Sequence, residues 1–144
     1  MSRTGFVIFY GGCPILWLSK LQTEVALSTT KAEYIALSQS LRDAMPLLGL
    51  IAELRDIFVF TTHPPLLSCT LFEDNKGALA LATDHKARPR TKHIGLKYHH
   101  FRSHVLSGLV NILPISTFEQ TADIFTKPLP VVTFRYLRAK LMGW

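Results

Sequence analysis

Three carboxylates lie beside expected boundaries of secondary structure, where side chains from separate segments can meet. Glu33 falls near the start of an expected long helix, Asp74 follows an expected strand, and Asp123 lies in an expected short helix. Each has an ordinary structural explanation, namely a helix dipole, an N-cap and a solvated helix surface. However, open α/β sheets gather ligands at strand ends, and converging carboxylates bind the Mg²⁺ ions of phosphodiester chemistry. A metal site is therefore a candidate function for these residues.

Positive charge is concentrated in one stretch, residues 85–104. This stretch holds six Lys and Arg residues, no Asp or Glu, and five of the six histidines. Residues 1–84 carry a net charge of −2 and residues 105–144 a net charge of +2, so the basic stretch accounts for the whole excess of +6. Such a pattern is typical of a surface that binds a polyanion, although a solvated loop and helix face can have the same composition.

The elements expected around these residues alternate between strands and helices. Runs rich in β-branched and aromatic residues flank Gly11 and Gly12 and predict a hairpin, with strand character again at 25–28. Apolar residues spaced by three and four predict a long helix that begins at Thr29 or Thr30. The later expected elements are a strand at 67–73, a helix at 76–82, a helix that starts near Ile94 and is ended by Gly108, a strand at 109–113, a short helix at 119–125 and a last helix that ends at 141. This order predicts a mixed α/β fold.

Length and composition favour one domain over residues 1–144. A chain of 144 residues with 48% hydrophobic residues can bury a substantial core. No apolar run is as long as a membrane span, and the N-terminal stretch lacks the charge cluster of a signal peptide. Cys13 and Cys69 form no CxxC pair and fit a reducing compartment. We expect an intracellular protein, cytoplasmic or nuclear, that is not secreted and has no membrane partner.

Four blocks of the sequence, in order and with regular intervals, resemble one protein family. The blocks are STTKAEYIALSQSLRDA, FEDNKGALALA, RTKHIGLKYHHFRSHV and EQTADIFTKPLP. They resemble the ribonuclease H domain of copia-type LTR retrotransposon polyproteins, the segment that follows the reverse transcriptase, from about Gly5 to Leu141. The resemblance implies a ribonuclease H-like α/β fold, with a mixed sheet flanked by helices. It also implies cleavage of the RNA strand of an RNA/DNA hybrid with two Mg²⁺ ions, which Mn²⁺ can replace.

The same motifs imply roles for individual residues. Glu33, Asp74 and Asp123 match the metal-binding catalytic carboxylates of the family. A hybrid hides its base edges in a deep groove, so we expect contacts to its backbone and its 2′-hydroxyl groups. We assign Asn75 to a hydrogen bond with a 2′-hydroxyl. Four residues of the basic stretch are assigned to phosphate contacts: Arg90, Lys92, His93 and Lys97.

The resemblance also implies a first strand that is absent from this chain. In the family, that strand carries a further catalytic aspartate and lies between the hairpin and the strand that ends at Asp74. Here no acidic residue precedes Glu24. We therefore expect one metal ligand to be missing and two strand edges to lack partners. The expected partners are an upstream reverse transcriptase segment of the same polyprotein and an RNA/DNA hybrid.

Other function classes compete with a hybrid nuclease. A catalytically inactive, nucleic-acid-binding remnant would bind hybrids in a salt-sensitive way without cleaving them. A zinc site of His93, His100 and His104 is a weaker alternative, because no CxxC pair accompanies the histidines. A serine nucleophile is weaker still, because the sequence has no GxSxG motif. We therefore expect no zinc.

Overall fold

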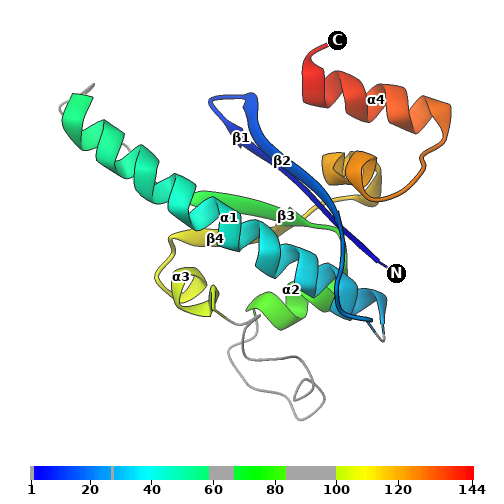
Figure 1. Cartoon of the computed structure of the whole chain (residues 1–144), viewed down its shortest axis with the longest axis horizontal. Helices are drawn as coiled ribbons and strands as arrows, with labels where there is room; N and C mark the ends of the chain where they lie inside the picture. Colours follow the sequence, from blue (N-terminus) through cyan, green and yellow to red (C-terminus); the bar gives the residue numbers. More distant parts are fainter. Residues whose placement is uncertain (1, 27, 59–66, 84–99) are drawn as a thin grey trace.

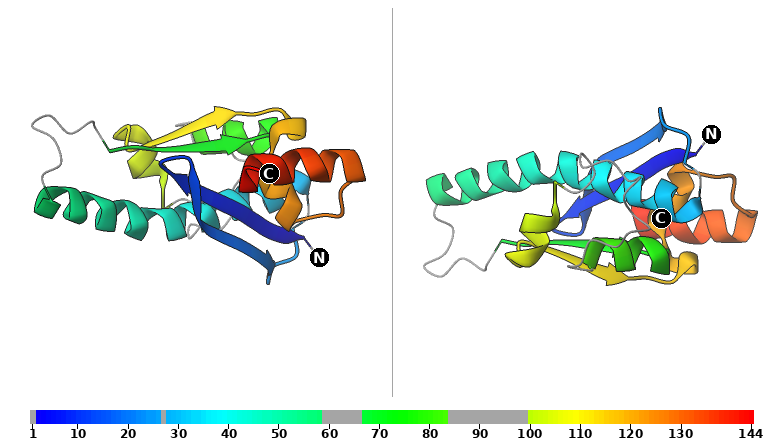
Figure 2. Two further views of the ribbon diagram at one scale, coloured as in Figure 1. Left: turned by 90° about the horizontal axis from the view of Figure 1, so that it is seen from above. Right: turned by 90° about the horizontal axis from the view of Figure 1, so that it is seen from below.

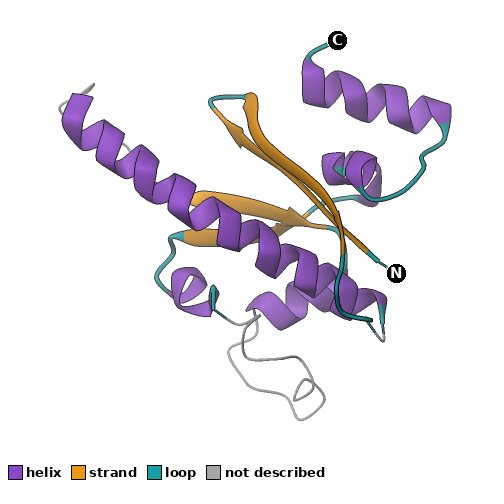
Figure 3. Cartoon of the chain, in the orientation of Figure 1, coloured by secondary structure: helices purple, strands orange, loops and turns teal. Residues whose placement is uncertain are grey.

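The computed structural model describes residues 2–26, 28–58, 67–83 and 100–144, drawn in colour in Figure 1. Helices and strands alternate along these ranges, which confirms the mixed α/β class (Figure 3). In chain order the elements are β1 (Arg3–Tyr10), β2 (Cys13–Leu21), α1 (Thr29–Phe58), β3 (Cys69–Glu73), α2 (Lys76–Thr83), α3 (Arg102–Leu106), β4 (Val110–Pro114), the 3₁₀ helices η3 (Thr117–Glu119) and η4 (Thr121–Phe125), and α4 (Val131–Met142).

The expected hairpin is formed by β1 and β2. The two strands pair in antiparallel register, with Arg3 opposite Leu21 and Tyr10 opposite Cys13. Gly11 and Gly12 make the turn with φ values of +58° and +81°, which glycine adopts at no steric cost.

The strand character expected at 25–28 is wrong. β2 ends at Leu21, and the described residues between it and α1, 22–26 and 28, form no strand. The buried Gln22 amide instead donates hydrogen bonds to the Ala32 carbonyl, at 2.9 Å, and to the Thr4 hydroxyl, at 3.2 Å. These bonds tie the connection to the start of α1, so the chain leaves the sheet at this point.

The long helix α1 begins where the sequence predicts, within one residue. Ser28 caps it, because its Oγ accepts from the Lys31 N–H at 3.2 Å and its carbonyl accepts from the Ala32 N–H. The predicted stripe is buried at Tyr34, Leu37, Leu41 and Ala44. Because α1 begins at Thr29, Glu33 lies just beyond the first turn, where it was expected, and that turn contains no acidic residue. A helix dipole acts mainly within the first turn and does not account for Glu33.

β3 and β4 form a separate, parallel pair whose register runs from Cys69 opposite Val110 to Glu73 opposite Pro114. α1, α2 and the residue before α3 pack beside this pair. The Tyr34 and Phe101 rings, both fully buried, meet with centroids 5.8 Å apart. The core cluster contains Tyr34, Leu37, Leu41, Ala78, Ala82, Phe101, Val110 and Ile112.

The two strand pairs are not joined into one sheet. Within the described residues, β1 pairs only with β2, and β3 pairs only with β4. Both β1 and β3 contact α1, and Figure 2 shows the two strand pairs as separate ribbons beside this helix. Among the residues that the structure describes, β1 and β3 therefore each keep one edge without a strand partner, as the sequence analysis expects.

The last third of the chain differs in detail from expectation. The short helix expected at 119–125 is two 3₁₀ helices, of which η4 carries Asp123. Much of the helix expected between Ile94 and Gly108 lies outside the described residues, and α3 is its described part. None of the helices in the described ranges combines the length and apolar character needed to cross a membrane.

Candidate active site

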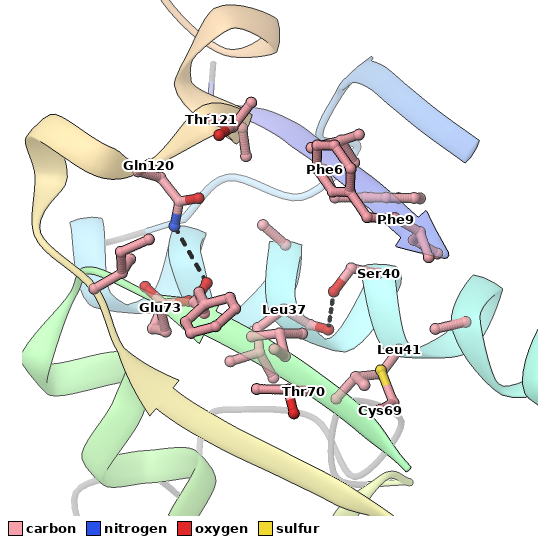
Figure 4. A pocket seen from close by; sticks show the side chains of 18 of the residues that line it. Phe6, Phe9, Leu37, Ser40, Leu41, Cys69, Thr70, Glu73, Gln120 and Thr121 are labelled. Atoms are coloured by element: carbon pink, nitrogen blue, oxygen red, sulfur yellow. Dashed lines mark hydrogen bonds between the residues drawn. The ribbon is translucent and has the colours of Figure 1, made fainter. Parts of the chain in front are cut away.

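A cavity of about 720 Å³ lies between the hairpin and the β3–β4 pair. Figure 4 shows Phe6 and Phe9 of β1 on one side of it, Thr70 of β3 on the opposite side, and Leu37 and Leu41 of α1 along it. Most of the lining is therefore apolar, and the cavity borders the edges of β1 and β3 that have no strand partner within the described ranges.

The three carboxylates singled out in the sequence line one end of this cavity. Glu33 comes from α1, Asp74 follows β3 and Asp123 belongs to η4. Although the Glu33 side chain is exposed to solvent, neighbouring atoms remove enough hydration to raise its pKa, and the charges of Asp74 and Asp123 raise it further. Burial also raises the pKa of Asp123, with a further contribution from Asp74. Residues far apart in the chain thus interact electrostatically at one place.

A fourth carboxylate, Glu73, lies at the same end and was missed by the sequence analysis. Its side chain is only 6% exposed, and burial raises its pKa from 4.5 to about 7, against a smaller lowering effect of the Asn75 backbone. The Asn75 N–H donates to Glu73 Oε1 at 3.0 Å. Strand alternation could have found this residue, because Glu73 shares a face of β3 with Cys69 and Leu71.

The N-cap of α2 is Asn75 rather than Asp74. Asn75 Oδ1 accepts from the Ala78 N–H at 3.0 Å, and the Asn75 carbonyl accepts from the Leu79 N–H. The ordinary structural explanation for Asp74 is therefore wrong. The Asn75 side-chain oxygen is committed to the start of α2, so its amide nitrogen is the side-chain group that remains for other contacts.

Two glycines allow close contacts beside the segments that carry the carboxylates. A Cβ at Gly77 would lie 2.7 Å from Thr30 Oγ1, so the starts of α1 and α2 are in contact there. A Cβ at Gly5 would lie 2.5 Å from Thr126 Cγ2, so η4 lies directly against β1. The first contact brings α1, which carries Glu33, close to the segment that follows Asp74, and the second holds η4, which carries Asp123, against β1.

Asp123 is already paired with a cation of the protein. Lys127 Nζ lies 2.8 Å from Asp123 Oδ2. This contact follows from the spacing of four residues, which the sequence analysis did not use.

The donor chemistry of this site suits a hard divalent cation, because Mg²⁺ prefers carboxylate oxygens. The carboxylates are not gathered into a finished coordination shell. Among the described residues, no group of three or more His, Cys, Asp or Glu side chains is arranged to hold a metal ion. The residues fit Mg²⁺ by type and by shared location, while their convergence is incomplete.

The predicted phosphate contacts cannot be compared with this geometry. Arg90, Lys92, His93 and Lys97 all lie outside the described residues. The alternative zinc set is also only partly described, since His93 belongs to the same gap.

Comparison with known proteins identifies homologues of this chain. The chain is 36% identical over 141 residues to the retrovirus-related Pol polyprotein from transposon RE2 of Arabidopsis thaliana, and 34% identical over 141 residues to that from transposon RE1. The chain is a homologue of a segment of copia-type retrotransposon Pol polyproteins. These two alignments cover 98% of this chain and 9% of each relative, so this Pol segment spans only a small part of the curated proteins that it matches.

A third relative agrees with this membership. The Pol polyprotein from transposon TNT 1-94 of Nicotiana tabacum is 36% identical over 129 residues, which are 90% of this Pol segment and 9% of the relative. No family model matches the segment, and no solved structure matches it.

Proposed function

We propose that this Pol segment is a ribonuclease H-type domain that cleaves the RNA strand of RNA/DNA hybrids by Mg²⁺-assisted hydrolysis. The observation that carries the proposal is the shared location of Glu33, Asp74 and Asp123 at one end of a single cavity. The sequence blocks that contain them resemble the ribonuclease H blocks of the same polyproteins. Carboxylates that raise one another's pKa at a cavity are typical of functional sites, because such crowding does not stabilise a fold.

Each residue at this end of the cavity has a distinct proposed role. Glu33, Asp74 and Asp123 would hold Mg²⁺, or Mn²⁺, through their carboxylate oxygens. When bound, the metal supplies an activated water and stabilises the leaving oxygen. Asn75 would donate its amide N–H to a 2′-hydroxyl, since its oxygen caps α2. Four basic residues would contact hybrid phosphates: Arg90, Lys92, His93 and Lys97.

The proposed protein partner is a strand from an upstream segment of the same polyprotein, lying in the cavity. On β3, the Cys69 N–H donates to the Leu109 carbonyl and the Glu73 carbonyl accepts from the Ile115 N–H, so both residues turn toward β4. By alternation, Thr70 and Phe72 turn their backbone groups toward the cavity. The Gln120 side-chain amide already donates to the Phe72 carbonyl at 3.2 Å, as a backbone N–H of an added strand would.

The facing edge of β1 is oriented in the same way. The Ser2 carbonyl accepts from the Gln22 N–H across the hairpin. By alternation, the backbone groups of Thr4 and Phe6 bond to β2, whereas the backbone groups of Gly5 and Val7 point toward the cavity. A strand between the two edges would join both pairs into one sheet and be covered by the apolar face of α1. The unpaired backbone groups of two open strand edges are a physical reason to expect such a partner, because open edges bind extended segments through backbone hydrogen bonds.

A second candidate function is nucleic-acid binding without cleavage. The specific observation in its favour is that the carboxylates within the described ranges do not converge into a group of three that holds a metal. The added strand would be expected to change this, because it would lie beside Asp74 and Asp123.

The test links this Pol segment to its upstream polypeptide and measures Mg²⁺-dependent cleavage of a labelled RNA/DNA hybrid. We expect cleavage of the RNA strand that stops when the metal is chelated and falls by about a hundredfold or more in Asp74→Asn. Asp56→Asn, at an exposed position of α1, is the matched control and should leave the rate unchanged. Activity unaffected by Asp74→Asn rejects the assignment. Binding without cleavage, weakened between about 50 and 200 mM salt, favours the second candidate.

A further inference from the structure

Glu33, Asp74 and Asp123 together form a carboxylate group that one described basic side chain contacts. The Lys127 ammonium lies 2.8 Å from Asp123 Oδ2. Among the residues that the structure describes, no other Lys or Arg forms an ion pair with Glu33, Asp74 or Asp123. The group therefore has a single protein cation in direct contact within the described ranges, although it combines several negative charges.

The two partners of this ion pair differ in how firmly they are held. The Thr126 and Lys127 N–H groups both donate to the Asp123 carbonyl, at 3.1 and 3.3 Å, so the backbone at this turn is fixed. The Asp123 side chain is 13% exposed, whereas that of Lys127 is 49% exposed. The ammonium can therefore move into water on its flexible stem while the carboxylate stays in the cavity.

The influence of Lys127 extends beyond its contact partner. Its positive charge lowers the pKa of Glu33, against the raising effects of burial and of Asp74 and Asp123. The ammonium thus acts on carboxylates from two elements, and it occupies an oxygen that a divalent cation would need.

We infer that Lys127 is a resident counter-cation of this carboxylate group and that an incoming divalent cation displaces it from Asp123. The inference rests on the proposed metal site. In the absence of the metal, Lys127 offsets the repulsion among Glu33, Asp74 and Asp123. When the metal binds, the ammonium leaves Asp123 Oδ2, so metal affinity is reduced by the strength of the ion pair.

The test measures Mn²⁺ binding to the complete chain by electron paramagnetic resonance, without any activity assay. Lys127→Gln removes the competing charge, and Lys127→Met keeps the apolar stem as a second variant. We expect both to lower the half-saturating Mn²⁺ concentration by roughly twofold to fivefold, the range of partly exposed ion pairs. Lys127→Arg should bind like the wild type. Lys140→Gln is the matched control, because Lys140 forms a similarly exposed pair with Glu119.

The outcomes separate this inference from the proposed function. Equal or weaker Mn²⁺ binding in Lys127→Gln and Lys127→Met overturns the inference but leaves the metal site standing, provided that Asp74→Asn weakens binding. Binding that appears only after Lys127 is replaced supports the inference strongly. If neither the wild type nor the variants bind Mn²⁺, or if Asp74→Asn has no effect, both the site and the inference fail. Circular dichroism checks that every variant is folded.

Discussion

The two ends of the cavity are built on the same elements but from opposite kinds of residue. At one end, Glu73 and Asp74 of the β3 terminus meet Glu33 near the start of α1. At the other end, Phe9 of β1 and Leu41 of α1 face each other across apolar space (Figure 4). The apolar end resembles a core that lacks one layer, whereas the acidic end opposes folding through burial and like charge. The contrast indicates that the apolar end stabilises the fold, whereas the acidic end reduces its stability.

The largest effect should come from the apolar end. Leu41 is fully buried in the core cluster, so Leu41→Ala is expected to lower the free energy of unfolding by about 2 to 5 kcal/mol. Leu50→Ala is the matched control on the same helix, because Leu50 is 50% exposed. Chemical denaturation measures both variants. Similar losses in the two would contradict the division between a buried and an exposed part of α1.

The acidic end should instead make stability depend on pH. The folded chain raises the pKa of Glu73 to about 7, so the folded state binds this proton more tightly than the unfolded state. Its stabilising contribution is complete below about pH 4.5 and is lost as the pH rises through about 7. Glu73→Gln should therefore stabilise the chain at pH 8 by roughly 2 kcal/mol and have little effect at pH 4.

Thermal unfolding across this pH range tests the expectation for Glu73. Glu53→Gln is the matched control, because it removes an exposed carboxylate of α1 and leaves Glu73 in place. A wild-type chain whose stability does not fall between pH 4.5 and 8 relative to Glu73→Gln would rule out a buried, protonated Glu73.

A smaller effect distinguishes two adjacent residues at the acidic end. Asn75 caps α2, so Asn75→Ala should lower the free energy of unfolding by about 1 kcal/mol. Asp74→Asn should change it by less than about 0.5 kcal/mol, because Asp74 makes no cap in the structure. Urea denaturation of the two variants compares them directly. A larger loss for Asp74→Asn would mean that Asp74 is a structural residue.

Local signals in the sequence account for the elements that were predicted well. The turn at Gly11 and Gly12 identifies the hairpin because few other residues adopt its positive φ angles. Apolar spacing likewise identifies α1, whose stripe is buried from Tyr34 to Ala44. The strand expected at 25–28 failed because the hydrogen bonds of Gln22 reach across to α1, which no local pattern records.

The candidate site was predictable only in part, for a related reason. The motifs identify Glu33, Asp74 and Asp123, and the structure brings them to one cavity. Strand alternation assigns Glu73 to the face of Cys69 and Leu71, but the extent of its burial depends on the elements that pack against that face. The contact of Lys127 with Asp123 has a local signal, the spacing of four residues, that the sequence analysis did not use.

Paramagnetic broadening by Mn²⁺ in the amide NMR spectrum tests most directly whether the three carboxylates share a divalent cation. We predict that low Mn²⁺ concentrations broaden the signals of residues adjoining Glu33, Asp74 and Asp123 together, and that Asp74→Asn weakens all three effects. The signals of the hairpin turn at Gly11 and Gly12 should stay sharp. Broadening confined to one of the three segments, or centred elsewhere in the chain, would contradict a shared metal site.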